Sequence, residues 1–136
     1  MSHKSILYLI ATMSIHSPTY MNAAAFATDP VERMKFVITE SLSFIYPTHT
    51  YEKPLNPILG ETYQGFQEDG SQIFMEQICH HPPISYMLQV GPDDLYRWSG
   101  YSSFTPKAHL NSIDLQSVGS KKIVFKDGTV ITYTPQ

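Results

Sequence analysis

The sequence has only one cysteine, no surplus of positive charge and no long apolar run among its 136 residues. The single thiol of Cys79 excludes an internal disulfide and is too little for a structural zinc site. With 9 Lys and Arg against 12 Asp and Glu, the formal net charge is -3. General attraction to nucleic acid is excluded, because it depends on clustered cations. Any phosphate recognition must therefore be local.

The composition is that of one globular domain, with 42% hydrophobic residues. Its first residues allow two interpretations, because Lys4 precedes an apolar run over residues 6–13 and small residues follow at 23–27. A secretory signal would place its cleavage site close behind the apolar run, and here the two are well separated. The run is also far shorter than the ~20 residues that span a bilayer. We favour a buried opening strand or helix, and treat residues 1–21 as an uncertain leader.

A helix is predicted to begin at Asp29, which is an N-cap residue followed by Pro30 and Glu32. Apolar residues then recur at helical spacing and form one stripe that must pack on something. They are Val31, Met34, Ile38, Leu42 and Ile45. Pro47 ends the pattern, and residues 22–27 favour a shorter helix before it.

Beyond Pro47 the pattern changes to extended segments. Residues 53–57 carry two prolines, which predict a stiff connector that ends near Gly60. The predicted strands are residues 61–67, 72–79, 84–90, 95–104, 109–116, 122–126 and 129–133. The predicted turns are residues 68–71, 91–94, 105–107, 118–120 and 127–128, the last a two-residue type I′ hairpin turn.

Short turns between consecutive strands predict an antiparallel meander, because parallel neighbours need crossovers of a dozen or more residues. The expected fold class is therefore α+β and mostly antiparallel β, with short N-terminal helices before the sheet. About eight strands are enough to enclose one small ligand. A sheet of this size either curls into part of a barrel or stays open and curved.

The least ordinary local feature is the pair His80 and His81, followed by Pro82 and Pro83. In a regular strand the two histidines would point to opposite faces. The prolines break the strand, since neither can donate to a sheet ladder, and this would let both imidazoles meet one ligand. The alternative that stays open is one histidine packed on the core and one in solvent.

Neither a metal site nor an active site is favoured. Cys79, His80 and His81 are consecutive, whereas zinc ligands normally have two to four residues between them. Cys79 as a nucleophile needs a base in reach, and nothing fixes a separation for Glu61 and Glu76 as an acid–base pair. No nucleophile elbow or phosphate-binding glycine loop occurs. We expect no catalytic residues, no metal and no cofactor.

Lys53 is a further candidate binding residue. A cation in a proline-stiffened loop loses less entropy on binding than one on a mobile segment. Together with His80 and His81 it would give a local positive field, in which a unit charge pair at ~4 Å is worth on the order of 4 kcal/mol. The alternative is an ordinary solvated lysine.

These residues carry a resemblance to a known family. Residues 76–83, Glu-Gln-Ile-Cys-His-His-Pro-Pro, resemble the signature Glu-Gln-(Val/Ile)-Ser-His-His-Pro-Pro of the oxysterol-binding protein family. Residues 53–63, Lys-Pro-Leu-Asn-Pro-Ile-Leu-Gly-Glu-Thr-Tyr, resemble a second block of that family. The likeness covers residues 22–136. It departs at Cys79, which replaces the usual serine and loses a hydroxyl donor while keeping the size.

The resemblance implies a large, incomplete antiparallel barrel with a hydrophobic tunnel, preceded by helices and a lid. Members of the family exchange lipids between membranes, phosphatidylinositol 4-phosphate against a sterol or, in some, phosphatidylserine. This implies a cytoplasmic protein in transient contact with membranes at organelle contact sites, and no enzyme. Matched by position, Lys53, Asn56, His80 and His81 would hold the inositol phosphate, with the Leu55 backbone at the same tunnel mouth.

The resemblance also implies that part of the domain is missing. In the family, a C-terminal segment adds a lysine, a glutamate and an arginine to the phosphate site. We therefore expect residues 1–136 to be a single partial domain, with a helical region at 22–47 and a sheet at 48–136. A second hypothesis is a phosphoinositide-binding regulatory or scaffold protein that does not move lipid.

Overall fold

The structure is a computed structural model that describes residues 4–45, 54–108 and 113–134. Helices begin much earlier than residue 22. The first three helical segments are α1 (Ile6–Met13), the 3-10 helix η1 (Ser14–His16) and α2 (Ser17–Phe26). Ser5 caps α1, where its hydroxyl oxygen accepts a hydrogen bond from the Leu7 amide at 3.3 Å. The opening apolar run is thus a helix, and the helix expected at residues 22–27 begins at Ser17.

Helix α3 (Pro30–Ser43) begins as predicted, because the Asp29 carboxylate accepts a hydrogen bond from the Glu32 amide at 3.2 Å. The predicted packing face is wrong. The residues of the apolar stripe, Val31 to Ile45, are 42% to 62% exposed. The buried face carries Arg33, Val37 and Glu40 instead. It can do so because the two charged side chains find hydrogen-bond partners inside the fold.

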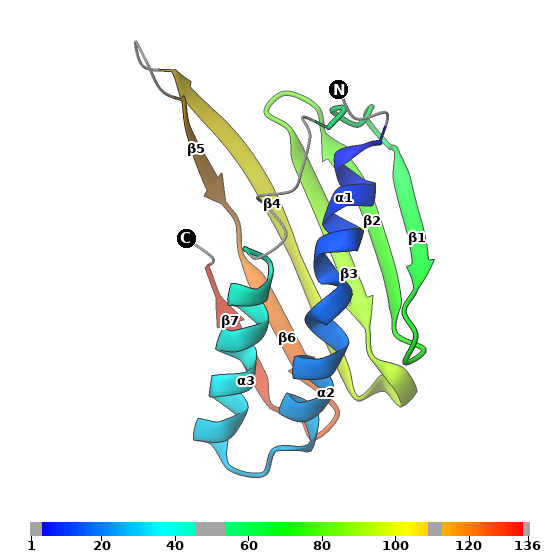
Figure 1. Cartoon of the computed structure of the whole chain (residues 1–136), viewed down its shortest axis with the longest axis vertical. Coiled ribbons are helices and arrows are strands. Elements are labelled where there is room, and N and C mark those ends of the chain that lie inside the picture. The colour runs from blue at the N-terminus through cyan, green and yellow to red at the C-terminus, as the bar shows by residue number, and fades with distance from the viewer. Residues whose placement is uncertain (1–3, 46–53, 109–112, 135–136) are drawn as a thin grey trace.

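The remaining elements form one antiparallel sheet. Its strands are β1 (Thr62–Phe66), β2 (Gln72–Cys79), β3 (Ile84–Val90), β4 (Tyr96–Ala108), β5 (Ile113–Val118), β6 (Lys121–Phe125) and β7 (Val130–Tyr133), with the 3-10 helix η3 (Pro92–Asp94) before β4. Strand order β1-β2-β3-β4-β6-β7, with β5 also on β4, confirms the predicted meander. The sheet is open and curved, with β1 and β7 at its edges (Figure 1).

Two of the predicted turns are wrong. Residues 105–107 continue β4, where Pro106 pairs with Leu115. The pairing of β4 with β3 ends at Ser103, so in the described sheet β4 has a neighbour on one side only at Pro106. A proline is tolerated there because no second ladder needs its missing N–H.

Residues 118–120 do not reverse the chain either. Val118 pairs with Ser103 and Lys121 pairs with Gly100, so β5 and β6 follow β4 in one register. They act as one long strand with a short interruption. A Cβ at Gly119 would collide with the carbonyl oxygen of Tyr101, so the close approach of the two backbones requires glycine.

The final hairpin forms where it was predicted, with a different turn. Gly128 has a φ of 87°, and Asp127 is not among the described residues with positive φ, so a type I′ turn is excluded. The Gly128 amide donates to the Phe125 carbonyl at 2.9 Å, and the Phe125 amide donates to the Thr129 carbonyl at 2.9 Å. This is a three-residue loop closed by a glycine bulge.

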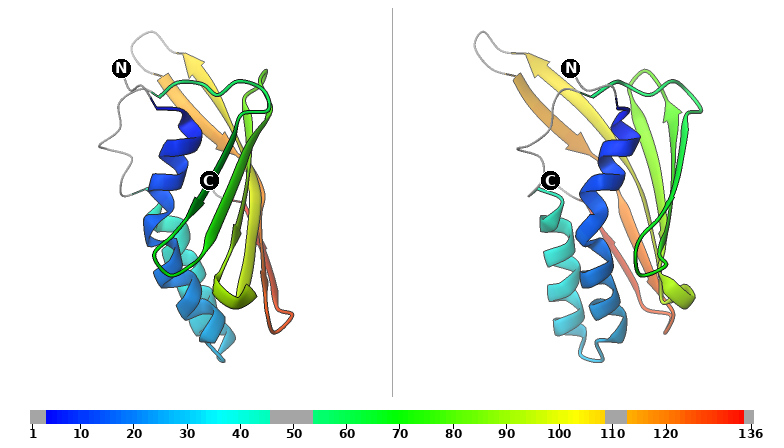
Figure 2. Two further views of the ribbon diagram at one scale, coloured as in Figure 1. Left: turned by 90° about the vertical axis from the view of Figure 1, so that its right-hand side faces the viewer. Right: turned by 45° about the vertical axis from the view of Figure 1, so that its right-hand side comes forward.

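Helices α1, α2 and α3 of the described chain lie on one face of the sheet, which gives two layers (Figure 2). The core between the layers is apolar, with Leu7, Met21, Val37, Ile73, Trp98 and Ile123 among its buried side chains. A buried polar chain crosses it, in which Ser17 bonds both Glu40 and Gln89 at 3.1 Å. Within the described ranges, no helix is long and apolar enough to cross a membrane.

Candidate functional site

The connector and the His-His-Pro-Pro segment meet at one end of the sheet. His80 Nδ1 lies 3.1 Å from the carbonyl oxygen of Pro57, which is buried. A carbonyl only accepts, so Nδ1 carries the proton and Nε2 is left for another partner. The Gly60 amide donates to the Gln77 carbonyl at 2.9 Å, and the Gln77 amide to the Glu61 carbonyl at 3.0 Å. The two sequence blocks therefore form one structural unit.

The two imidazoles come together just beyond the end of β2. Their ring centroids lie 4.5 Å apart at an interplanar angle of 63°. His80 is half-buried and His81 is exposed, so neither is packed deep in the core. The peptide between His81 and Pro82 is cis. The end of the strand thus places both rings on one corner of the molecule, where one anion can reach both; His80 donates to it from Nε2 only as an imidazolium, because its Nδ1 proton is bonded to Pro57.

The other residues of the predicted site lie on the connector. Asn56 is exposed, which leaves its amide accessible. Leu55 is also exposed, but its backbone is already bonded: its amide donates to the Lys4 carbonyl, and its carbonyl accepts from the Ile6 amide, both at 3.0 Å. The start of the chain is thereby tied to the connector. Lys53 lies outside the described residues.

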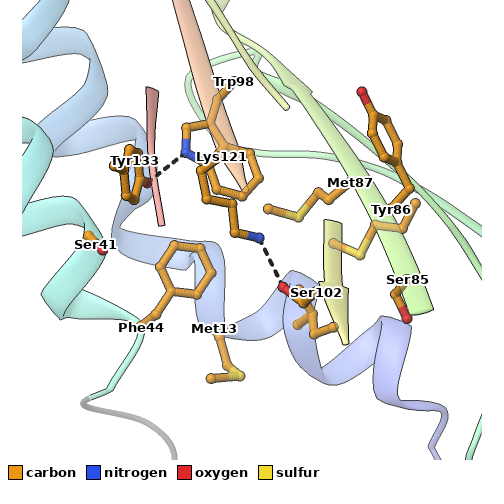
Figure 3. A pocket seen from close by; sticks show the side chains of 12 residues that line it. Met13, Ser41, Phe44, Ser85, Tyr86, Met87, Trp98, Ser102, Lys121 and Tyr133 are labelled. Atoms are coloured by element: carbon orange, nitrogen blue, oxygen red, sulfur yellow. Dashed lines mark hydrogen bonds between the residues drawn. The ribbon is translucent and has the colours of Figure 1, made fainter. Parts of the chain in front are cut away.

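A separate cavity of about 170 Å³ lies between the helices and the sheet. Its walls are mainly apolar and include Met13, Phe44, Met87 and Trp98 (Figure 3). Sites for drug-sized ligands have volumes of about 300–1,000 Å³. The cavity as it stands is smaller than that.

One cation, Lys121, points into this cavity (Figure 3). Its ammonium group donates to the Ser102 hydroxyl at 3.0 Å and lies 4.7 Å from the centre of the Trp98 ring. Burial lowers the pKa of Lys121 to about 8. Lys121 was not predicted as a site residue, although the alternation of inward and outward side chains along β6 indicates its position. Ile123 and Phe125 are buried, so Lys121 shares their face of the strand.

Glu40 is another buried charged residue that was not predicted from the sequence. Burial raises the pKa of Glu40 to about 7, against hydrogen bonds from Ser17 and Tyr133 that lower it. The Ser17 hydroxyl donates at 3.1 Å and the Tyr133 hydroxyl at 3.4 Å. A charged residue on the inner face of a helix is not visible from apolar periodicity. In the part of the chain that the structure describes, no three His, Cys, Asp or Glu side chains gather as a metal site.

Comparison with known proteins shows which family the chain resembles. The family model described as oxysterol-binding protein matches residues 1–136, which includes the first 21 residues. Oxysterol-binding protein 9 of Dictyostelium discoideum is 38% identical over 131 residues, covering 96% of this chain and 31% of the relative. Oxysterol-binding protein-related protein 3B of Arabidopsis thaliana is 34% identical over 108 residues, covering 79% and 23%.

Two solved structures share the fold. The Osh3 ORD of Saccharomyces cerevisiae in complex with PI(4)P has a TM-score of 0.82 and 28% identity, covering 97% of this chain and 36% of that one. The Osh1 ORD in complex with cholesterol has a TM-score of 0.83 and 26% identity, covering 96% and 32%. The chain thus spans about a third or less of the length of these relatives. From its motifs, its fold and the match to its whole length, the chain belongs to the oxysterol-binding protein family.

Proposed function

We propose that this chain binds lipid and contributes to non-vesicular lipid transfer, in which phosphatidylinositol 4-phosphate is exchanged for a sterol or phosphatidylserine. One observation carries the proposal: the connector and the paired histidines form a single corner through the His80–Pro57 contact. The complexes of the similar Osh3 and Osh1 domains with PI(4)P and with cholesterol support a phosphoinositide and a sterol as ligands. No covalent step is involved, so the function is binding and transport.

In this proposal the inositol phosphate binds at the corner. His81 donates to phosphate oxygens, His80 donates from Nε2 as an imidazolium, and Asn56 donates from its side-chain amide. Lys53, at the start of the same connector, adds a positive charge. The Leu55 backbone stays paired with residues 4–6 and acts by fixing the connector's position. The protein acts in the cytoplasm, in transient contact with membrane surfaces.

A second function is favoured by the size of the cavity. At about 170 Å³ the cavity encloses only part of a lipid. This size fits a protein that binds the lipid head group and leaves the lipid in the membrane. In that case the chain is a phosphoinositide-binding regulatory or scaffold protein. The two functions share the head-group corner and differ in whether lipid leaves the membrane.

Liposome assays test both functions with the same chain. Donor vesicles carry labelled phosphatidylinositol 4-phosphate, and control vesicles carry phosphatidylinositol. We expect binding that requires the 4-phosphate, followed by movement of label to sterol-containing acceptor vesicles. Binding without movement would select the scaffold function. Equal binding to both vesicle types, unchanged in a His80→Ala, His81→Ala double variant, would disprove the head-group site.

A further inference from the structure

The outer face of α3 carries an apolar stripe that no described part of the chain covers. Its side chains are 42% to 62% exposed, and they are Val31, Met34, Ile38, Leu42 and Ile45. Single apolar residues on a surface are ordinary. A row of them along one face of a helix is different, because contiguous exposed apolar surface marks a site of interaction.

The stripe lies beside an open edge of the sheet. Among the described strands β7 pairs only with β6, so the backbone groups on its outer side have no ladder partner there. Met34 of the stripe and Ile131 of β7 line the same groove. Figure 1 shows α3 and β7 on the same side of the molecule, away from β1. A partner that supplies both a strand and a helix would cover the edge and the stripe together.

The spacing of the stripe is symmetric about Ile38. Its successive members are separated by three, four, four and three residues, which is the same in both directions along the helix. Two antiparallel copies of α3 with Ile38 against Ile38 would therefore align Met34 with Leu42 of the second copy. Val31 would align with Ile45 of the second copy in the same way. A two-fold interface needs such a self-complementary surface, which makes a second copy of this chain the occupant that fits.

The same two-fold axis would pair the edges of the two sheets. Arg33 of α3 donates to the Thr129 hydroxyl, just before β7 begins. Tyr133, the last residue of β7, donates to Glu40 of α3. Ile38 lies between Arg33 and Glu40, so it is level with the middle of β7. An axis through Ile38 and perpendicular to the sheet therefore brings two β7 strands together antiparallel at their middles.

Spacing and charge both permit this arrangement. Helix α3 contacts β6, where Arg33 lies 4.8 Å from the centre of the Phe125 ring, and β7 through Tyr133. With α3 above these two strands, its two copies would be about two strand spacings apart, within the 8–10 Å of packed helices. Glu32 and Lys35, in the N-terminal half of α3, pair with each other at 2.6 Å. They would face the C-terminal half of the second α3, whose exposed residues carry no charge.

We propose that two copies of this chain form a two-fold symmetric dimer through β7 and the outer face of α3, so that the two sheets become one. The contact consists of one four-residue strand and one helix face, and we expect a dissociation constant on the order of 10 µM. The corner formed by His80 and His81 follows β2, in the other half of the sheet, and stays open in both copies. The dimer therefore does not depend on the proposed lipid function.

Sedimentation velocity of the full chain over a series of concentrations tests the dimer. We expect the mass to rise from one chain to two as the concentration passes about 10 µM. Ile38→Glu places two like charges at the axis, and should weaken association at least about a hundredfold. Ile38→Lys should do the same. An equal mixture of the two variants should associate again, because opposite charges then meet at the axis.

A substitution at the other edge of the sheet is the matched control. Phe66 on β1 is 81% exposed, and Phe66→Glu should leave association unchanged. Circular dichroism shows whether each variant is folded. If an Ile38 variant is not, Leu42→Glu mixed with Met34→Lys replaces the pair, since these positions also face each other across the axis.

Four results would overturn the proposal. They are a mass that stays at one chain or grows past two, a dimer that survives in both folded Ile38 variants, no association in their mixture, and loss of association in folded Phe66→Glu.

Discussion

The imidazole of His80 lies 3.1 Å from the carbonyl oxygen of Pro57, 23 residues earlier in the chain. This contact fixes the tautomer of His80 and the path of the connector together. It gives His80 a structural role that His81, which is exposed, does not share. The two neighbours therefore differ in what their loss should change.

Alanine at each histidine separates the two roles. We expect His81→Ala to leave the free energy of unfolding within about 0.5 kcal/mol of the parent, as is usual for exposed sites. His80→Ala should lower it by about 1 kcal/mol, because the Pro57 carbonyl loses its partner. Both should weaken binding to vesicles with phosphatidylinositol 4-phosphate. Urea denaturation and vesicle flotation measure the two effects, and equal stability of the variants would contradict a structural role for His80.

The buried Glu40 predicts an unusual dependence of stability on pH. Its pKa is about 7 in the folded chain and 4.5 ordinarily, so the folded state binds the proton more tightly. The contribution of Glu40 to the free energy of unfolding should therefore be highest below pH 4.5 and should fall as the pH rises to 7. The total change is on the order of 3 kcal/mol.

A Glu40→Gln variant tests this dependence, since glutamine keeps an acceptor for the Ser17 hydroxyl and does not titrate. Its stability should change much less than that of the parent between pH 5 and 7, as measured by urea denaturation. Lys121, with its pKa lowered to about 8, acts in the opposite sense at higher pH. Parallel pH profiles of variant and parent would contradict the assignment to Glu40.

The contacts of Arg33 predict that its loss destabilises the fold far more than the loss of its ion-pair partner Asp127. Its guanidinium donates to the carbonyls of Ala24 and Ala27 at 3.1 and 2.7 Å, and pairs with Asp127 at 2.6 Å. It also donates to the Thr129 hydroxyl at 2.7 Å, which joins the helices to the last hairpin.

We expect Arg33→Ala to lower the free energy of unfolding by about 2–4 kcal/mol, because buried carbonyls lose their donor. Asp127→Asn should lower it much less than Arg33→Ala, since that carboxylate is 48% exposed and solvent screens the ion pair. The lower pKa of Asp127, about 2, rests mainly on its bond to Arg33. Chemical denaturation compares the two variants, and similar losses would show that the ion pair matters more than the carbonyl bonds.

The orientation of α3 gives a fourth prediction. Val37 is 3% exposed, whereas Ile38 is 52% exposed and Leu42 is 59% exposed. Val37→Ala should lower the free energy of unfolding by about 1–3 kcal/mol through lost burial and a cavity. The double change Ile38→Gln, Leu42→Gln should lower it by less than about 1 kcal/mol and reduce binding of a hydrophobic dye. A greater loss in the double variant would mean that the stripe is the packed face.

Much of the fold could be predicted from the sequence where local patterns decide it. The bounds of β2 and β3 are as predicted, since each strand alternates apolar and polar residues and has turn residues on both sides. The cap at Asp29 was also recognisable, because it depends on four consecutive residues. The turn expected at Pro106 was wrong, since tolerance of proline there depends on where the pairing with β3 ends.

The packing face of α3 and the inner cavity could not be predicted, because they too depend on contacts between residues far apart in the sequence. Apolar periodicity favoured Val31 and its neighbours, while Arg33 and Glu40 are buried through partners as distant as Thr129 and Ser17. The motifs indicated that the connector and the histidines belong to one site, and they lie together. They did not indicate the Pro57 contact, which depends on how the connector folds back onto β2.

The meander also bears on the order in which the molecule assembles. Each strand pairs with a strand that adjoins it along the chain, or nearly so, and short loops are cheap in entropy to close. Contacts between residues close in sequence form quickly, so each hairpin should form early and without the others. The bonds from Ser17 to Gln89 and from Arg33 to Thr129 span 72 and 96 residues. Docking of the helices onto a preformed sheet is therefore the step that should limit the folding rate.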